Sequence, residues 1–183
     1  QVDSAAQWLQ MTWMFFYDKK KWTQPRIRSF LKAVPDDKLI LLDYYCDHTE
    51  IWRNTEKYYG NPYIWCYLGN FGGNTMIAGN LNDIDFKIKR LFKEGGDNVY
   101  GLGATLEGFD VNPLMYEFVF DQAWDYPVTT DQWITNWSMC RGGDQDANII
   151  KAWRALHQNI YTEYAICGQS VLMNARPRLT GTK

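Results

Sequence analysis

Short, nearly continuous apolar runs recur along the first hundred residues, and each has the length of a β-strand. Three of them span residues 38–43 (KLILLD), 63–68 (YIWCYL) and 99–104 (VYGLGA). Such runs are typical of strands buried on both faces of a parallel sheet. A fourth run, residues 8–16 (WLQMTWMFF), is too aromatic for a surface segment and is predicted to be a buried strand with its exit loop. The pattern therefore predicts four buried strands.

Segments with helical spacing separate these runs. Thr23 and Pro25 are suited to start a helix that Pro35 ends. Residues 76–93 carry apolar side chains three or four positions apart, and residues 112–124 are predicted to form a further helix. Strands that recur roughly every 25–35 residues with a helix between them are typical of a parallel βα series.

Four βα units make up half of a (β/α)8 TIM-like barrel, which usually has about 250 residues. We therefore expect an α/β fold that is half of such a barrel, with a four-stranded open sheet as the competing interpretation. The chain enters an apolar aromatic run almost directly after Gln1, which favours a fragment of a longer chain.

The pattern changes after Trp124. Pro127 marks a break, Thr130 is suited to cap a helix, and residues 144–162 have apolar positions at helical spacing. We predict two domains: residues 1–126 as the C-terminal half of the barrel, and residues 127–183 as the start of an α-helical domain.

Composition narrows the function classes. The chain has 183 residues, 46% hydrophobic and 22% charged, with a formal net charge of −2. These values are typical of a globular protein without the basic excess of nucleic-acid or anionic-membrane binders. No apolar stretch of about 20 residues is present to span a membrane. We therefore expect neither nucleic acid nor membrane as a partner.

Cysteine and histidine usage gives no sign of a metal, a redox motif or another cofactor. The four cysteines form no C-x-x-C pair and are predicted to be buried free thiols, and only two histidines are present. Aromatic residues, in contrast, make up 16% of the chain. Trp and Tyr rings stack on sugars and bind hydroxyl groups, so this surplus favours a carbohydrate ligand over other small molecules.

Loops that follow the strands of a βα barrel build its active face. Here those loops contain Trp13, residues 43–50, residues 70–74 and Glu107. Glu107 follows a strand with small residues at Gly101 and Gly103, where a ligand or chain can approach closely. An isolated Glu in a loop is more often an ordinary surface acid, so neighbouring motifs must decide its role.

Two motifs supply a family resemblance. Residues 61–74 read NPYIWCYLGNFGGN and residues 101–112 read GLGATLEGFDVN. Together they resemble the α-N-acetylglucosaminidase family, glycoside hydrolase family 89. Weaker matches at residues 8–15, 39–43, 152–156 and 174–177 extend the resemblance over nearly the whole chain. One departure is Gly69, where the animal enzymes have His.

The resemblance implies that Glu107 is the catalytic nucleophile of a retaining glycosidase that removes terminal α-linked N-acetylglucosamine without a cofactor. The general acid/base glutamate would lie before Gln1, so the remaining N-terminal part of the enzyme would be a partner and the fragment alone would be inactive. A secreted, periplasmic or lysosomal location is likewise implied by the family.

The remaining site residues are hypotheses from their place in the loops. Trp13 and Trp65 are expected to line the sugar pocket, and Asn70 and Asn74 to bind its hydroxyl groups. The acids at positions 43, 50 and 117 are expected to be structural.

Two other function classes remain open. A non-catalytic carbohydrate-binding or assembly module would keep the aromatic pocket without the reaction. A phosphate-binding barrel enzyme would use the Gly72-Gly73 loop as an anion site, but residues 61–86 contain no basic side chain.

Overall fold

The computed structural model describes residues 3–69, 72, 77–108, 112–124, 128–143 and 146–164. Its first part is a four-stranded sheet in the order β1-β2-β3-β5, and all three neighbouring pairs are parallel. The predicted α/β fold with a parallel βα series is confirmed. The strands are β1 (Trp8–Met11), β2 (Leu39–Asp43), β3 (Tyr63–Tyr67) and β5 (Val99–Ala104).

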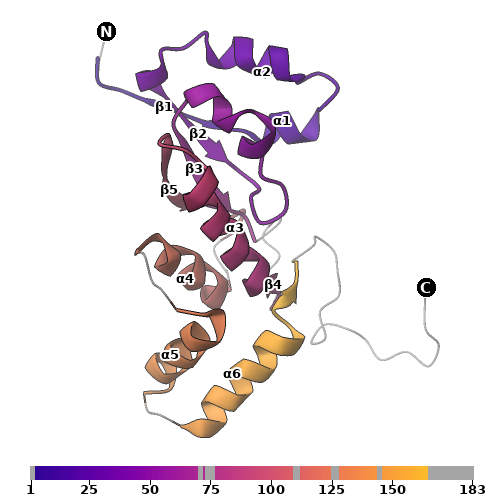
Figure 1. Ribbon diagram of the computed structural model, residues 1–183, viewed down its shortest axis with the longest axis vertical. Helices are drawn as coiled ribbons and strands as arrows, with labels where there is room; N and C mark the ends of the chain where they lie inside the picture. Colours follow the sequence, from indigo (N-terminus) through magenta and orange to yellow (C-terminus); the bar gives the residue numbers. More distant parts are fainter. Residues whose placement is uncertain are drawn as a thin grey trace, which may run out of the picture.

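Helices α1, α2 and α3 lie beside the strands, whereas α4, α5 and α6 gather in the other half of the molecule (Figure 1). None of the helices in the described ranges has the length and apolar character needed to cross a bilayer. The α-helices are α1 (Trp13–Tyr17), α2 (Gln24–Leu31), α3 (Leu81–Glu94), α4 (Pro113–Asp121), α5 (Thr130–Gly142) and α6 (Ala147–Asn159). Short 3₁₀ turns are η1 (Asp36–Lys38), η2 (Trp52–Asn54), η3 (Lys57–Gly60) and η4 (Gln122–Trp124).

The first strand differs from its prediction as a buried strand. Only β1 is extended, and the apolar run then turns into α1. Trp8 is 62% exposed and Leu9 is 64% exposed. The physical reason is that β1 lies at the edge of the sheet, where β2 is its only paired strand among the described residues.

Capping residues explain where three helices begin: α3 and α6 begin later than predicted, and α5 is capped by Thr129 rather than by Thr130. The Asn80 side chain accepts from Asp83 N, so α3 begins at Leu81. The short strand β4 (Gly79–Asn80) pairs antiparallel with β6 (Thr162–Glu163). Helix α6 therefore ends before Thr162. Thr129, with Gln132, forms a capping box for α5. Asp146 caps α6.

A left-handed turn before β3 carries backbone strain. The φ angles of Glu56, Lys57, Tyr58 and Tyr59 lie between 48° and 59°. Each non-glycine residue in this region costs roughly 1–2 kcal/mol. The turn places Tyr58 in the core with no exposed surface, so burial of its ring offsets part of this strain.

Asp43 ends β2 inside the core with no exposed surface. Its Oδ1 accepts from Ile51 N at 3.3 Å and its Oδ2 from Trp52 N at 3.0 Å. Burial raises the pKa of Asp43 to about 7, although these hydrogen bonds favour the charged form. The carboxyl group therefore fixes the loop that follows β2.

Replacing the exposed Lys57 with glycine in the complete natural protein should raise the free energy of unfolding by about 0.5–1 kcal/mol, because glycine adopts positive φ without a Cβ clash. Lys151→Gly, at an exposed position inside α6, is the matched control and should lower it by about 1 kcal/mol. Denaturant unfolding measures both values. A loss of stability in both variants would contradict the strain argument.

Asp43 also predicts a pH dependence. Its folded pKa is raised, from 3.8 to about 7, so its contribution to stability is fully present below about pH 4 and is lost as pH rises through about 7. Relative to Asp43→Asn, which cannot titrate, the natural protein should lose at most about 4 kcal/mol of unfolding free energy over this window. Denaturant titrations at several pH values measure the difference. If stability depended on pH in the same way in the two proteins, the raised pKa of Asp43 would be excluded.

Candidate functional site

The carboxyl ends of the four parallel strands lie along one edge of the sheet, and the segments that leave them carry the candidate site. Thr12 follows β1, Tyr44 follows β2, Leu68 follows β3 and Thr105 follows β5. Thr105 Oγ1 donates to the carbonyl oxygen of Tyr44 at 2.7 Å. This bond joins the exits of β2 and β5 on either side of β3.

Glu107 lies at this edge with its carboxylate held by two donors. Tyr44 Oη donates to Oε1 at 3.0 Å, and the backbone N–H of Gly72 donates to Oε2 at 2.6 Å. Glu107 is nevertheless exposed, so its carboxylate is oriented without being sealed from a ligand. A carboxylate fixed at both oxygens and open to solvent is suited to attack an electrophile or to bind a cation.

Tyr44 is a site residue that the sequence analysis did not single out. Burial, followed by the neighbouring Glu107 carboxylate, raises the pKa of Tyr44 to about 12. The phenol therefore stays protonated over the physiological range and acts as a donor to Glu107. The only sequence signal was its position directly after the predicted strand, within residues 43–50.

Trp13, the first residue of α1, lies beside Tyr44. Its ring is half-buried, with its centroid 5.8 Å from the ring of Tyr44 and 5.5 Å from that of Tyr45. Tyr44 therefore contacts both Trp13 and Glu107.

Trp65 has a different environment from the one predicted. It has no exposed surface, and its Nε1 donates to Glu50 Oε1 at 3.0 Å. A fully buried ring offers no face to a sugar, so we do not include Trp65 in the proposed pocket. The prediction did not account for strand alternation, which sends neighbouring side chains of β3 to opposite faces of the sheet.

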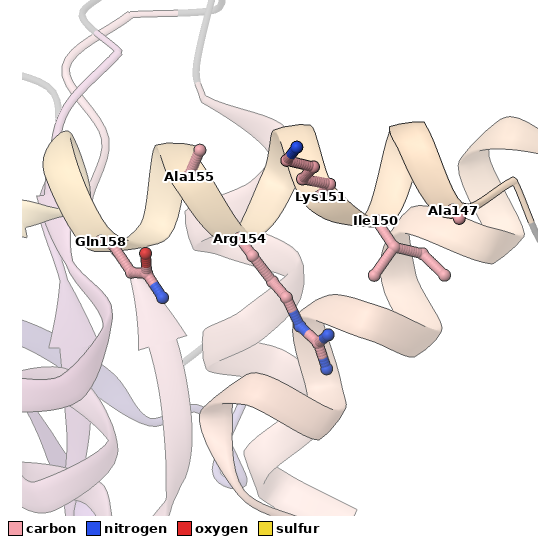
Figure 2. Close-up of a pocket in the computed structure, with 6 residues that line it drawn as sticks. All are labelled: Ala147, Ile150, Lys151, Arg154, Ala155 and Gln158. Atoms are coloured by element: carbon pink, nitrogen blue, oxygen red, sulfur yellow. The ribbon is translucent and has the colours of Figure 1, made fainter.

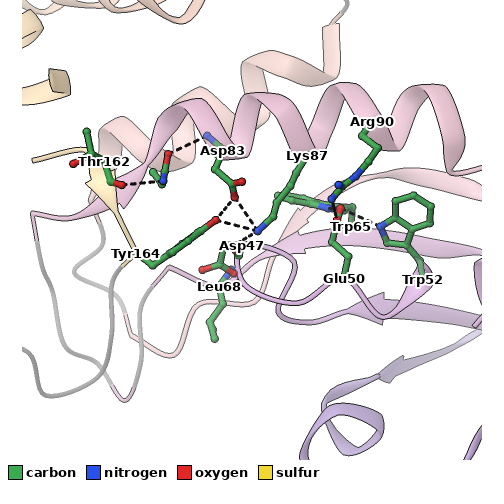
Figure 3. Close-up of polar contacts among 11 residues, drawn as sticks. Asp47, Glu50, Trp52, Trp65, Leu68, Asp83, Lys87, Arg90, Thr162 and Tyr164 are labelled. Atoms are coloured by element: carbon green, nitrogen blue, oxygen red, sulfur yellow. Dashed lines mark hydrogen bonds and ion pairs between the residues drawn. The ribbon is translucent and has the colours of Figure 1, made fainter. Parts of the chain in front are cut away.

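Glu50 organises the buried polar contacts around Trp65 (Figure 3). Its carboxylate also accepts from Trp52 Nε1 at 3.1 Å and forms an ion pair with Arg90 of α3. Glu117 likewise accepts from Trp137 Nε1 at 2.6 Å, in the helical half of the molecule. Together with Asp43, these acids have structural roles in the core and between helices.

Asn70 and Asn74, predicted to bind sugar hydroxyl groups, lie outside the described residues. Gly72, between them, is described and supplies the N–H that reaches Glu107. The segment after β3 therefore contributes to the site at least through its backbone.

The cysteines agree only in part with the prediction of buried free thiols. Cys46 and Cys66 are buried and unpaired, and burial raises the pKa of Cys66 to about 12. Cys140 is exposed, so the prediction was wrong there, while Cys167 lies outside the described residues. Within the part of the chain that the structure describes, no group of three or more His, Cys, Asp or Glu side chains is placed to hold a metal ion.

A hollow of about 510 Å³ lies along α6 (Figure 2), and Glu107 is not among its lining residues. Its lining comes from one helix, and Arg154, at its centre, forms an ion pair with Asp131 at 2.7 Å. This surface groove has no carboxylate among its lining residues and is not the candidate active site. The lining consists of Ala147, Ile150, Lys151, Arg154, Ala155 and Gln158.

Comparison with known proteins places this arrangement in a family. The family described as the alpha-N-acetylglucosaminidase (NAGLU) tim-barrel domain matches residues 1–126, and the family described as the NAGLU C-terminal domain matches residues 133–183. Human alpha-N-acetylglucosaminidase is 31% identical over 164 residues, which cover 87% of this chain and 22% of the human protein.

Solved structures share the fold. A family 89 glycoside hydrolase from Clostridium perfringens in complex with PUGNAc superimposes with a TM-score of 0.76 at 24% identity, over 95% of this chain and 19% of that chain. The Clostridium enzyme in complex with its substrate GlcNAc-alpha-1,4-galactose gives a TM-score of 0.75 at 24% identity, over 97% of this chain and 19% of that chain. This chain thus spans about a fifth of the length of the proteins it matches.

The two family matches and the human relative confirm the resemblance that the motifs around Asn61 and Glu107 indicated. The chain belongs to the α-N-acetylglucosaminidase family, glycoside hydrolase family 89.

Proposed function

We propose that the complete natural protein containing this chain is a retaining glycoside hydrolase that removes terminal α-linked N-acetylglucosamine, with Glu107 as its nucleophile. Family membership supports the reaction class, since the human relative is an alpha-N-acetylglucosaminidase. The Clostridium enzyme, with its GlcNAc-alpha-1,4-galactose substrate, supports the substrate class.

The observation that carries the proposal is the geometry of Glu107. Its exposed carboxylate lies beyond the carboxyl end of β5 and is oriented by Tyr44 Oη and the Gly72 N–H. In βα barrels this edge is where catalytic residues gather. Donors to both oxygens hold the group in one orientation, which favours attack along a fixed line.

The stereochemistry of the substrate explains why the protein must supply a nucleophile. In an α-linked N-acetylglucosamine, the 2-acetamido group lies on the same face as the departing oxygen. It therefore cannot displace that oxygen from behind, and a carboxylate on the opposite face must do so. Retention requires a second carboxyl group about 5 Å from the first.

The reaction then has two displacements. In the first, a Glu107 oxygen bonds to the anomeric carbon while the glycosidic C–O bond breaks and the second carboxyl group protonates the departing oxygen. In the second, that group removes a proton from water, whose oxygen displaces Glu107 and restores its carboxylate. We propose that the second carboxyl group comes from a part of the enzyme outside these 183 residues, as the family resemblance implies.

Tyr44, Trp13 and the asparagines have supporting roles in this proposal. Tyr44, held neutral by its raised pKa, orients Glu107 in the resting enzyme. Trp13 contacts Tyr44 and offers its ring to the apolar face of the sugar. Asn70 and Asn74 remain proposed partners of the sugar hydroxyl groups.

The proposal extends to domain organisation and location. The family matches to residues 1–126 and 133–183 support a barrel segment followed by the start of a helical domain, with the division near residue 127. Family membership also supports a secreted, periplasmic or lysosomal enzyme whose other partner is the remaining part of its own barrel.

A non-catalytic carbohydrate-binding module is the rival function. It would keep Trp13 and the sugar contacts but would have no need for an oriented carboxylate. The two donors to Glu107 favour the enzyme, because they hold the group in the orientation that a nucleophile needs.

Glu107→Gln in the complete natural protein should reduce hydrolysis of 4-nitrophenyl α-N-acetylglucosaminide by roughly 10³-fold or more, because an amide cannot act as the nucleophile. Released 4-nitrophenol measures the rate. Glu94→Gln, an exposed change at the end of α3, is the matched control and should leave kcat within about twofold. An inactive natural protein, or a Glu107 variant as fast as the control, would favour the binding module.

Tyr44→Phe should lower kcat by about 10-fold to 100-fold and change KM little, because it removes one of the two donors that orient the nucleophile while leaving the ring against Trp13. Steady-state kinetics with the same substrate measure both constants. An unchanged kcat would show that the bond to Glu107 Oε1 has no role in catalysis.

A further inference from the structure

We propose that Asp47 is a positioning residue for Glu107, acting through the backbone that leads from Leu68 to Gly72. The inference rests on the proposed function of Glu107 as a nucleophile. Asp47 itself follows β2, and its carboxylate binds the segment that leaves β3.

The carboxylate of Asp47 binds two consecutive backbone N–H groups. Its Oδ1 accepts from Leu68 N at 3.1 Å (Figure 3). Its Oδ2 accepts from Gly69 N at 3.1 Å. Asp47 is only 3% exposed, so water does not compete for these bonds. A buried carboxylate without such donors would strongly destabilise the folded protein. The N–H groups of Leu68 and Gly69 are therefore held where they face the Asp47 carboxylate.

The backbone at Gly69 packs closely against the ring of Tyr67. Its φ is +60°, and a Cβ at this position would lie 2.3 Å from the ring of Tyr67. Three residues further on, the Gly72 N–H donates to Glu107 Oε2 at 2.6 Å. Three residues span at most about 11 Å, so the position of Gly69 restricts where the Gly72 donor can lie.

Asp47 is in turn fixed from the side of α3. Lys87 Nζ donates to the carbonyl oxygen of Asp47 at 2.5 Å and lies 2.9 Å from Asp83 Oδ2. It also contacts Tyr164 Oη at 3.3 Å, after β6 (Figure 3). Lys87 is 8% exposed. The contacts therefore run from Tyr164 through Lys87 and Asp47 to the backbone of Leu68 and Gly69.

A second contact, from α4, holds the same backbone. Tyr116 Oη, on α4, donates to the carbonyl oxygen of Leu68 at 2.5 Å. Its ring packs edge-on against Tyr67, with centroids 5.1 Å apart. Leu68 is thus bound at both its N–H and its carbonyl group, by Asp47 and Tyr116.

The chemistry requires a carboxylate rather than an amide at position 47. Two adjacent N–H donors need two acceptor oxygens, whereas an amide offers one oxygen and turns its NH₂ group toward the other donor. Asp47→Asn should therefore displace Leu68 or Gly69 while leaving the side-chain volume unchanged.

The test compares two matched variants of the complete natural protein. Asp121, at the end of α4, is also an acid with a structural contact, because it accepts from Trp133 Nε1 at 2.8 Å, but it lies in the helical half and outside the segments that hold Glu107. Asp47→Asn should lower kcat by about 10-fold or more with KM changed less than about threefold, since orientation of the nucleophile acts in the transition state. Asp121→Asn should keep kcat within about twofold.

Amide hydrogen exchange separates failure of this inference from failure of the proposed function. The Gly72 N–H should exchange faster in Asp47→Asn than in the natural protein, with no change in Asp121→Asn. Equal exchange and equal kcat in the two variants would overturn the positioning role. If Gly72 exchanged faster in Asp47→Asn but the natural protein had no glycosidase activity, the coupling of Asp47 to Gly72 would stand. The proposed function of Glu107, on which the positioning role depends, would be overturned.

Tyr116→Phe provides a second test if Asp47→Asn does not fold. It keeps the ring against Tyr67 and removes only the donor to Leu68. A drop in kcat of about threefold or more with unchanged KM would support the positioning of this backbone. An unchanged kcat together with unchanged exchange at Gly72 would contradict it.

Discussion

Parallel pairing of β2, β3 and β5 is the constraint on which the candidate site depends. The register that places Leu41 beside Tyr63, and Tyr63 beside Val99, sends all three strand exits to one edge. Tyr44 and Glu107 are 63 residues apart in sequence, yet they form a hydrogen bond there because β3 alone separates their strands. The site therefore exists only once the sheet has formed.

Acids at this edge divide into buried structural groups and one oriented, exposed group. Asp43, Asp47 and Glu50, all in or after β2, are buried and satisfied by backbone or indole N–H groups. Their bonds fix the loops and, through Asp47, the backbone that leads to Gly72. Glu107 has two donors as well, but it is exposed. Burial, rather than residue type, separates the supporting carboxylates from the proposed nucleophile.

The sequence predicted the positions of the strands better than the burial of individual side chains. Continuous apolar runs located β2 and β3, because strands covered on both faces need apolar side chains throughout. They also located β5, but its predicted burial was wrong: it lies at the end of the strand order opposite β1, and none of its residues is buried. The same apolar signal wrongly predicted that Trp8 is buried, because an apolar run does not show whether its strand lies at the edge of the sheet. It also placed Trp65 in the pocket, whereas its face depends on strand alternation. Tyr44 was missed because its contact with Glu107 is a product of topology, without a local motif.

Covalent trapping tests the central claim, that Glu107 is the nucleophile, most directly. The complete natural protein would be inactivated with a 5-fluoro α-N-acetylglucosaminyl fluoride, which forms the glycosyl-enzyme ester and slows its hydrolysis. Peptide mass spectrometry would then locate the added sugar. The account predicts one label, on the Glu107 side chain at the exit of β5. A label on another carboxylate, or turnover without any covalent adduct, would contradict it.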